Sequence, residues 1–167
     1  IRSIQIKKEA LKTPECSGDC EHIKDLLDVK IETVPFDVLQ KSSYLLHKEG
    51  LNSIHLILWK NELIDIVEND KDLYGFAVDI GTTTVVAYLY NLSAGKMIGV
   101  YSSLNGQVSE GADVISRIVA CTKNPDGVIR LQEKIIKTIN GLIEQARKQH
   151  NLSIDDIYYM ALCGNSA

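Results

Sequence analysis

The residues best suited to chemistry form the hexapeptide Asp-Ile-Gly-Thr-Thr-Thr at positions 79–84, between two apolar runs. A glycine at a bend lets backbone N–H groups approach an anion closely, and threonine hydroxyls add donors. The pattern predicts a phosphate-binding turn with Gly81, Thr82, Thr83 and Thr84 on the phosphates and Asp79 on a Mg²⁺-bound water. The alternative is an ordinary hairpin turn in which the threonines serve β-strand propensity.

A second polar group, Gly164-Asn165-Ser166, follows the last predicted strand. Loops at the ends of strands in open α/β sheets usually line ligand crevices, so we expect Gly164 and Asn165 to contact the same ligand. The alternative is a simple strand-to-helix turn.

Five polar residues follow the third strand and open the next helix. They either face a nucleotide cleft or a partner protein, or they form an ordinary capped helix start. These residues are Asn105, Gln107, Glu110, Asp113 and Arg117.

The four cysteines are too sparse and uneven for a disulfide framework, which favours a reducing, cytoplasmic setting. Cys121 and Cys163 stand among apolar residues and are predicted to be buried. Cys16 and Cys20 could approach one metal ion, but a structural zinc site needs four ligands. An inert or oxidisable surface pair is therefore the preferred interpretation for them.

Composition describes a globular chain of 167 residues, 45% hydrophobic and 24% charged, with a net charge of −4. This charge gives no reason to expect nucleic acid or an anionic membrane as the main partner. The longest apolar run, residues 54–59, is far shorter than the roughly 20 residues of a membrane-spanning helix. The chain starts without methionine and ends after a predicted strand, so we expect two internal cuts in a longer protein.

The sequence divides into three predicted segments, which together position these residues. Residues 1–22 are polar and aperiodic, as in a linker or arm, and residues 23–72 form a small β-α-β-β middle domain. Its elements are predicted at residues 29–33, 36–48, 53–59 and 62–68, with a tight turn at Lys60-Asn61.

Residues 73–167 are predicted to begin a second domain after a charged hinge at residues 69–72. Three consecutive strands, two helices and a buried final strand follow in order. Their predicted ranges are 76–80, 85–92, 97–104, 112–122, 128–150 and 157–163. The fold class is therefore α/β (α+β), and the second domain has the start of a ribonuclease H-like, actin-like sheet.

The segment Gly-Phe-Ala-Val-Asp-Ile-Gly-Thr-Thr-Thr-Val-Val-Ala at residues 75–87 resembles the first phosphate motif of the superfamily of acetate and sugar kinases, heat-shock chaperones and actin (ASKHA). Three other segments narrow the resemblance to the reductive activators of corrinoid proteins, ferredoxin-linked ATPases of methyl-transferring anaerobes. They are Leu-Asn-Gly-Gln at 104–107, Glu-Gly-Ala-Asp-Val-Ile-Ser-Arg-Ile at 110–118 and Cys-Gly-Asn-Ser at 163–166.

The resemblance implies a parent protein that binds ATP and Mg²⁺ and passes an electron from a 2Fe-2S cluster to the Co(II) corrinoid of a methyltransferase partner. The cluster would belong to an N-terminal domain outside this chain, which has no plant-type Cys-x₄-Cys-x₂-Cys spacing. The chain would then hold the linker, the middle domain and the first part of the actin-like domain, and we expect it to be inactive alone. Two alternatives are a sugar or carboxylate kinase of the same superfamily and a non-catalytic scaffold that forms a homodimer through the middle domain.

Overall fold

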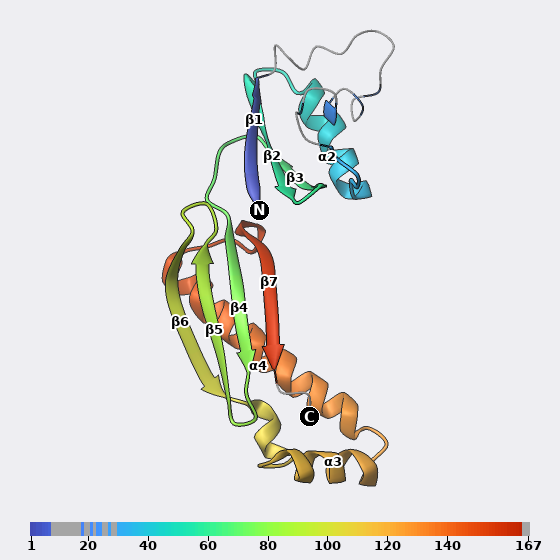
Figure 1. Ribbon diagram of the computed structural model, residues 1–167, viewed down its shortest axis with the longest axis vertical. Helices are drawn as coiled ribbons and strands as arrows, with labels where there is room; N and C mark the ends of the chain where they lie inside the picture. Colours follow the sequence, from blue (N-terminus) through green and yellow to red (C-terminus); the bar gives the residue numbers. More distant parts are fainter. Residues whose placement is uncertain (8–17, 19–20, 22, 25–26, 28–29, 165–167) are drawn as a thin grey trace. The chain divides into compact units, whose positions relative to one another are not determined.

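The computed structural model describes residues 1–7, 18, 21, 23–24, 27 and 30–164 (Figure 1). The chain forms two compact units, Ile1–Lys71 and Asp72–Ala167, and each contains one sheet. The mixed α/β class expected from the sequence is confirmed. Among the described residues, no helix combines the length and apolar character needed to cross a membrane.

The first unit has a three-stranded antiparallel sheet in the order β1-β2-β3, packed with helix α2 (Phe36–His47). Its strands are β1 (Arg2–Lys7), β2 (Ser53–Trp59) and β3 (Glu62–Val67). The predicted tight turn between β2 and β3 is confirmed: Lys60 has a left-handed φ of 53°, which suits a two-residue hairpin turn. The central strand β2 contributes Ile54, Leu56 and Leu58 to this core, and Leu56 and Leu58 are fully buried.

The start of the first unit corrects two predictions. Arg2–Lys7 is a strand paired with β2, so the interpretation of residues 1–22 as a linker or arm is wrong there. Ile4 and Ile6 alternate with polar residues, as in a strand with one buried face, but two apolar positions gave too short a pattern to recognise. The strand predicted at residues 29–33 is reduced, in its described part, to one bridge between Thr33 and Glu62, on the side of β3 away from β2.

The second unit has a four-stranded sheet in the order β6-β5-β4-β7 (Figure 1). Strands β4 (Tyr74–Ile80), β5 (Thr84–Asn91) and β6 (Lys96–Leu104) form an antiparallel meander, as predicted, and β7 (Ile157–Gly164) lies parallel to β4. The segment between β6 and β7 contains the helices α3 (Val114–Lys123) and α4 (Gly127–His150) and the short 3-10 helices η2 (Gly106–Ser109) and η3 (Ile154–Asp156).

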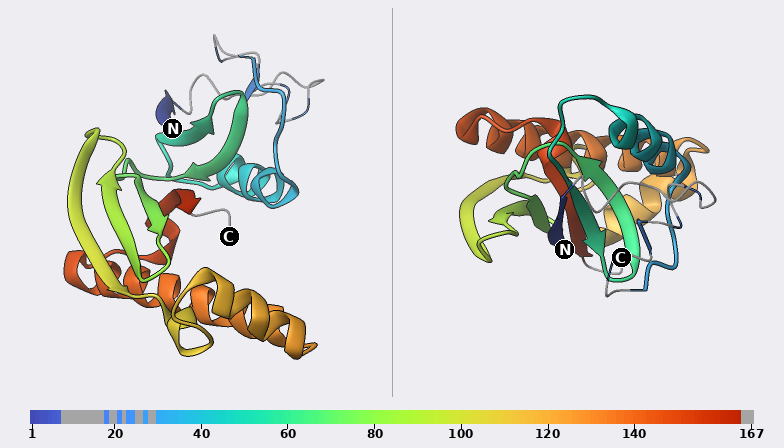
Figure 2. Two further views of the ribbon diagram at one scale, coloured as in Figure 1. Left: turned by 60° about the horizontal axis from the view of Figure 1, so that its bottom comes forward. Right: turned by 90° about the horizontal axis from the view of Figure 1, so that it is seen from above.

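Helix α4 covers one face of this sheet, as Figure 2 shows. Its apolar side chains Ile139, Leu142 and Ala146 are buried against the strands, because they recur at the spacing of one helix face. Phe76 and Leu89 are among the strand residues of this core. The sheet therefore has an inner face on α4, and by strand alternation the neighbouring side chains lie on its outer face.

Strand β7 differs from the prediction of a buried final strand. Tyr159, Met160 and Leu162 are exposed, with 58% of Leu162 accessible. The reason is that α4 packs mainly on β5 and β6, so the side chains of β7, at the end of the described sheet, are left uncovered. The predicted burial of Cys163 is wrong for the same reason, and Cys121 is only half-buried.

Candidate phosphate-binding turn

The predicted turn joins β4 to β5 at one end of the sheet, with Ile80 paired to Val85 across it. The Gly81 N–H donates to the Thr84 carbonyl oxygen over 3.0 Å, which closes the turn. A Cβ atom added to Gly81 would lie 2.7 Å from that same oxygen, closer than real Cβ contacts come. The turn therefore requires glycine at this position for steric reasons.

Three successive carbonyl groups of the turn are bound from inside the protein. The Asn105 side-chain Nδ2 donates to Gly81 O over 2.9 Å, and the Asn105 backbone N–H donates to Thr83 O over 2.7 Å. The Arg117 Nη2 donates to Thr82 O over 2.5 Å. Figure 1 shows the turn beside η2, the element that follows Asn105. The carbonyl oxygens of these three peptides therefore all point toward the protein interior.

This arrangement fixes the direction of the peptide N–H groups. The described part of the chain has no cis peptide bond, and in a trans peptide the N–H points opposite to the C=O. Inward carbonyls at Gly81, Thr82 and Thr83 therefore turn the next three N–H groups outward. Those of Thr82 and Thr83 have no acceptor within the described residues. Outward donors with no acceptor of their own are suited to an anion.

Asp79 lies near the end of β4, exposed, on the outer face of the sheet. It is the register partner of Cys163 in β7, whose thiol Sγ is 3.8 Å from Asp79 Oδ1. Among the described residues, no group of three or more histidine, cysteine or acidic side chains could hold a metal ion. A single exposed carboxylate suits contact with a hydrated Mg²⁺, because that ion usually keeps several of its waters.

Gly164 lies beside the start of the turn, since it is the register partner of Ile80. A Cβ atom on Gly164 would be 3.2 Å from Ile80 Cβ and from Ile80 O, so the two strands approach closely here. The structure thus brings Gly164 close to residues 79–84, whereas Asn165 falls outside the described residues. Cys16 and Cys20 also fall outside them.

The five polar residues after the third strand divide into two groups, and the first supports the turn. Asn105 and Arg117 are buried, and both bond to Gln107: its Oε1 accepts from Arg117 Nη1 over 3.2 Å and from Asn105 Nδ2 over 3.3 Å. Gln107 Nε2 in turn donates to Leu131 O of α4. The sequence left open whether these residues face a cleft or cap a helix, but they hold the turn from behind.

The second group consists of Glu110 and Asp113. Glu110 forms ion pairs with Arg130 and Lys134 of α4, at 3.4 and 3.3 Å. Asp113 is the N-cap of α3 and exchanges hydrogen bonds with Ser116 in a capping box. For Asp113 the structure agrees with the alternative of a capped helix start, whereas Glu110 binds the neighbouring helix α4 instead.

Asp113 leads to a prediction about pH. The Ser116 backbone N–H donates to its carboxylate over 2.8 Å and lowers the pKa of Asp113 below the usual 3.8, although partial desolvation opposes this. A lowered pKa in the folded state stabilises the fold above the unfolded pKa, and this contribution is lost as pH falls through the folded pKa. We expect an NMR titration to give a pKa for Asp113 below 3.8.

Asp113→Asn should remove this part of the acid dependence of unfolding. Asp126→Asn is the matched control, because Asp126 is the N-cap of α4 but makes no side-chain capping hydrogen bond. An Asp113 carboxyl that titrates at or above its usual pKa would contradict the prediction.

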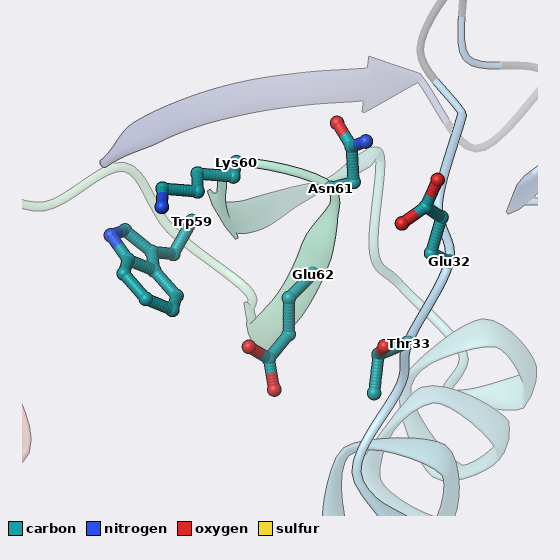
Figure 3. Close-up of a pocket in the computed structure, with 6 residues that line it drawn as sticks. All are labelled: Glu32, Thr33, Trp59, Lys60, Asn61 and Glu62. Carbon is teal, nitrogen blue, oxygen red and sulfur yellow. The ribbon is translucent and has the colours of Figure 1, made fainter.

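The first unit contains a hollow (Figure 3). Its volume is about 220 Å³, and it lies between the segment at Glu32 and Thr33 and the tip of the β2–β3 hairpin. The Lys60 ammonium lies 4.9 Å from the centre of the Trp59 ring. Its lining residues all belong to the first unit.

Comparison with known proteins gives consistent matches. A family model described as the RACo middle region matches residues 74–167. The chain is 37% identical over 169 residues to a protein of Eubacterium limosum described as the corrinoid activation enzyme RamQ. That match covers 99% of this chain and 28% of the relative.

Among solved structures, the chain is similar to a reductive activator for a corrinoid, iron-sulfur protein, with a TM-score of 0.81 and 28% identity. The match covers 98% of this chain and 27% of that one. A likeness to Ta0583, an archaeal actin homolog, has a TM-score of 0.38 and 13% identity, covers 82% of this chain and 57% of that one, and supports no argument. The chain thus spans between a quarter and a third of the length of RamQ and of the solved reductive activator.

Proposed function

The chain belongs to the RACo middle region family, and on this basis we propose that it supplies the first phosphate-binding turn of an ATP-dependent reductive activator of corrinoid proteins. The resemblance that the sequence indicated is confirmed by the family match and by the two relatives named as corrinoid activators. The proposed parent passes an electron from a 2Fe-2S cluster, held outside this chain, to the Co(II) corrinoid of a methyltransferase partner.

The observation that supports a nucleotide role is the fixed direction of the turn peptides. Asn105 and Arg117 take the three carbonyl oxygens, so the outward side presents N–H groups and threonine hydroxyls. We assign phosphate contacts to Gly81 and to the three threonines at 82–84, with Gly164 and Asn165 as further contacts. The second unit would then be the N-terminal part of an actin-like ATP-binding domain, and the first unit, Ile1–Lys71, a small middle domain that includes strand β1.

Binding of ATP to the full-length protein is the direct test. We expect isothermal titration to give micromolar affinity for Mg·ATP in that protein and much weaker binding in the 167-residue chain, which holds only part of the site. In the full-length protein, absorbance of the corrinoid partner should report conversion of Co(II) to Co(I) that is faster with ATP than without it. A full-length protein that fails to bind ATP would overturn the proposal.

Asp79 gives a sharper test of the metal contact. Asp79→Asn keeps the size and polarity of the side chain but removes the charge that holds a Mg²⁺-bound water. Because a hydrogen bond to a charged group contributes about 1.5–3 kcal/mol, we expect affinity for ATP in the presence of Mg²⁺ to fall about tenfold or more. Affinity measured in EDTA should change little.

The matched control is Asp72→Asn, an exposed carboxylate just before β4 at the opposite end of that strand. It should leave both affinities unchanged. Equal loss with and without Mg²⁺ in Asp79→Asn would contradict a metal role and indicate damage to the turn itself.

The partner assignments are proposals of the same kind. We propose a corrinoid protein as the main partner, a homodimer formed through the middle domain, and a cytoplasmic location, without nucleic acid or membrane partners. The net charge of −4 gives no electrostatic attraction to polyanions such as nucleic acid or an anionic membrane. Sedimentation of the full-length protein over a range of concentrations tests the dimer, and a monomer at every concentration would exclude it.

A further inference from the structure

We infer that Arg117 of α3 is a positioning residue for nucleotide binding, because its guanidinium sets the direction of the Thr82–Thr83 peptide. This inference rests on the phosphate role proposed for the turn and adds a residue that is not itself at the turn surface. Arg117 lies 35 positions after Thr82 in the sequence, and only the fold brings the two together.

The guanidinium of Arg117 makes three hydrogen bonds in three directions. Nη2 donates to Thr82 O over 2.5 Å, Nε to Gly111 O over 3.0 Å and Nη1 to Gln107 Oε1 over 3.2 Å. The residue is 9% exposed, so these bonds are shielded from water. A planar guanidinium held at three points has one orientation, and the peptide bonded to it is fixed with it.

Among the side chains that the structure describes, the positive charge of Arg117 has no close counter-ion. Within the described residues it has no carboxylate at ion-pair distance, and its three acceptors are neutral. Its charge reaches Asp113 and contributes to the lowered pKa of that carboxyl. A shielded cation without a close anion is costly, so an anion brought to the turn would find a favourable potential.

The position of Arg117 is itself closely set by its surroundings. Its backbone N–H donates to Asp113 O in the first turn of α3. A Cβ atom on Gly111 would lie 2.5 Å from Ser116 Oγ and 2.7 Å from the Arg117 backbone N, so the loop before α3 packs tightly against the helix. Movement of α3 would therefore move the guanidinium, and with it the Thr82–Thr83 peptide.

Two substitutions separate geometry from charge. Arg117→Lys keeps the charge but loses the planar fork, and Arg117→Met loses both while retaining an unbranched side chain. The matched control is Arg147→Met. Arg147 lies on helix α4 and also donates to a backbone carbonyl, Leu152 O. Leu152 follows α4 and leads into the start of β7, at the end of the sheet opposite the turn.

The test uses full-length protein and measures affinity for Mg·ATP and for adenosine by titration, together with the melting temperature. In Arg117→Met we expect ATP affinity to fall about thirtyfold, within the range for loss of a hydrogen bond to a charged group. Arg117→Lys should lose about tenfold, and adenosine affinity should stay within twofold in both variants. Arg147→Met should bind both ligands as the wild type does.

The outcomes separate the inference from the proposal beneath it. If the wild-type protein binds no ATP, the proposed function fails. If the wild type binds ATP and both Arg117 variants bind it equally well, the positioning role fails alone. Parallel loss of ATP and adenosine affinity would also overturn it, because that pattern indicates general damage. Should Arg117→Met not fold, Arg117→Lys decides by the same ratio of the two affinities.

Discussion

Replacement of Gly81 by alanine is expected to lower the affinity of the full-length protein for Mg·ATP by about a hundredfold. The added Cβ would meet Thr84 O at 2.7 Å; this oxygen belongs to the backbone and the backbone fixes the position of the Cβ, so no side-chain rotation relieves the contact. The turn must open and break the Gly81 N–H bond to Thr84 O. Misplacement of binding groups by about 1 Å can cost a factor of this size. Isothermal titration gives the measurement.

Gly141→Ala is the matched control for this substitution. Gly141 lies inside α4, and a Cβ atom there would meet nothing within 4 Å. Alanine is favoured over glycine in helices, so we expect unchanged ATP affinity and a gain in stability of about 0.5–1 kcal/mol. Wild-type affinity in Gly81→Ala would show that the turn does not need its present shape to bind phosphate.

Leu89→Ala is expected to have the largest effect on stability, lowering the free energy of unfolding by about 2–5 kcal/mol. Leu89 has 0% exposure and belongs to the core between β5 and α4. Truncation removes buried methyl groups and leaves a cavity in the packed interior. Urea unfolding of the 167-residue chain, followed by far-ultraviolet circular dichroism, measures the change.

Leu104→Ala makes the same chemical change on the adjacent strand β6. Leu104 is 62% exposed, so its truncation should alter stability by no more than about 0.5 kcal/mol. Equal effects of the two substitutions would mean that the described packing of α4 on the sheet does not exist in solution.

The second unit was largely predictable from the sequence because its signals are local. The strands that flank the turn have continuous apolar runs, and α4 repeats apolar residues over 24 positions. The turn itself was found from residue types alone, since glycine followed by three threonines between strands is unusual for packing but suited to anion binding. The mixed α/β class followed from the order of these elements.

The sequence-based predictions failed where the structure depends on contacts between residues far apart in the sequence. Strand β1 has only two apolar positions, and its partner β2 begins 46 residues after it ends, at Ser53 following Lys7. The bonding of Arg117 to Thr82 O depends on how α3 meets the turn, which no spacing in the sequence encodes. The exposure of β7 was missed because an apolar run reads the same whether or not a neighbour covers it.

The one-sided pairing of β7 also affects how this region behaves when it is produced by itself. β7 is the last strand of the described sheet, and its residues Met160 and Leu162 are exposed. An edge strand with exposed apolar side chains is a site where another copy of the chain can add a strand, so preparations at high concentration should form intermolecular β-ladders and lose solubility. A lysine at position 162 would protect this margin by charge repulsion between copies.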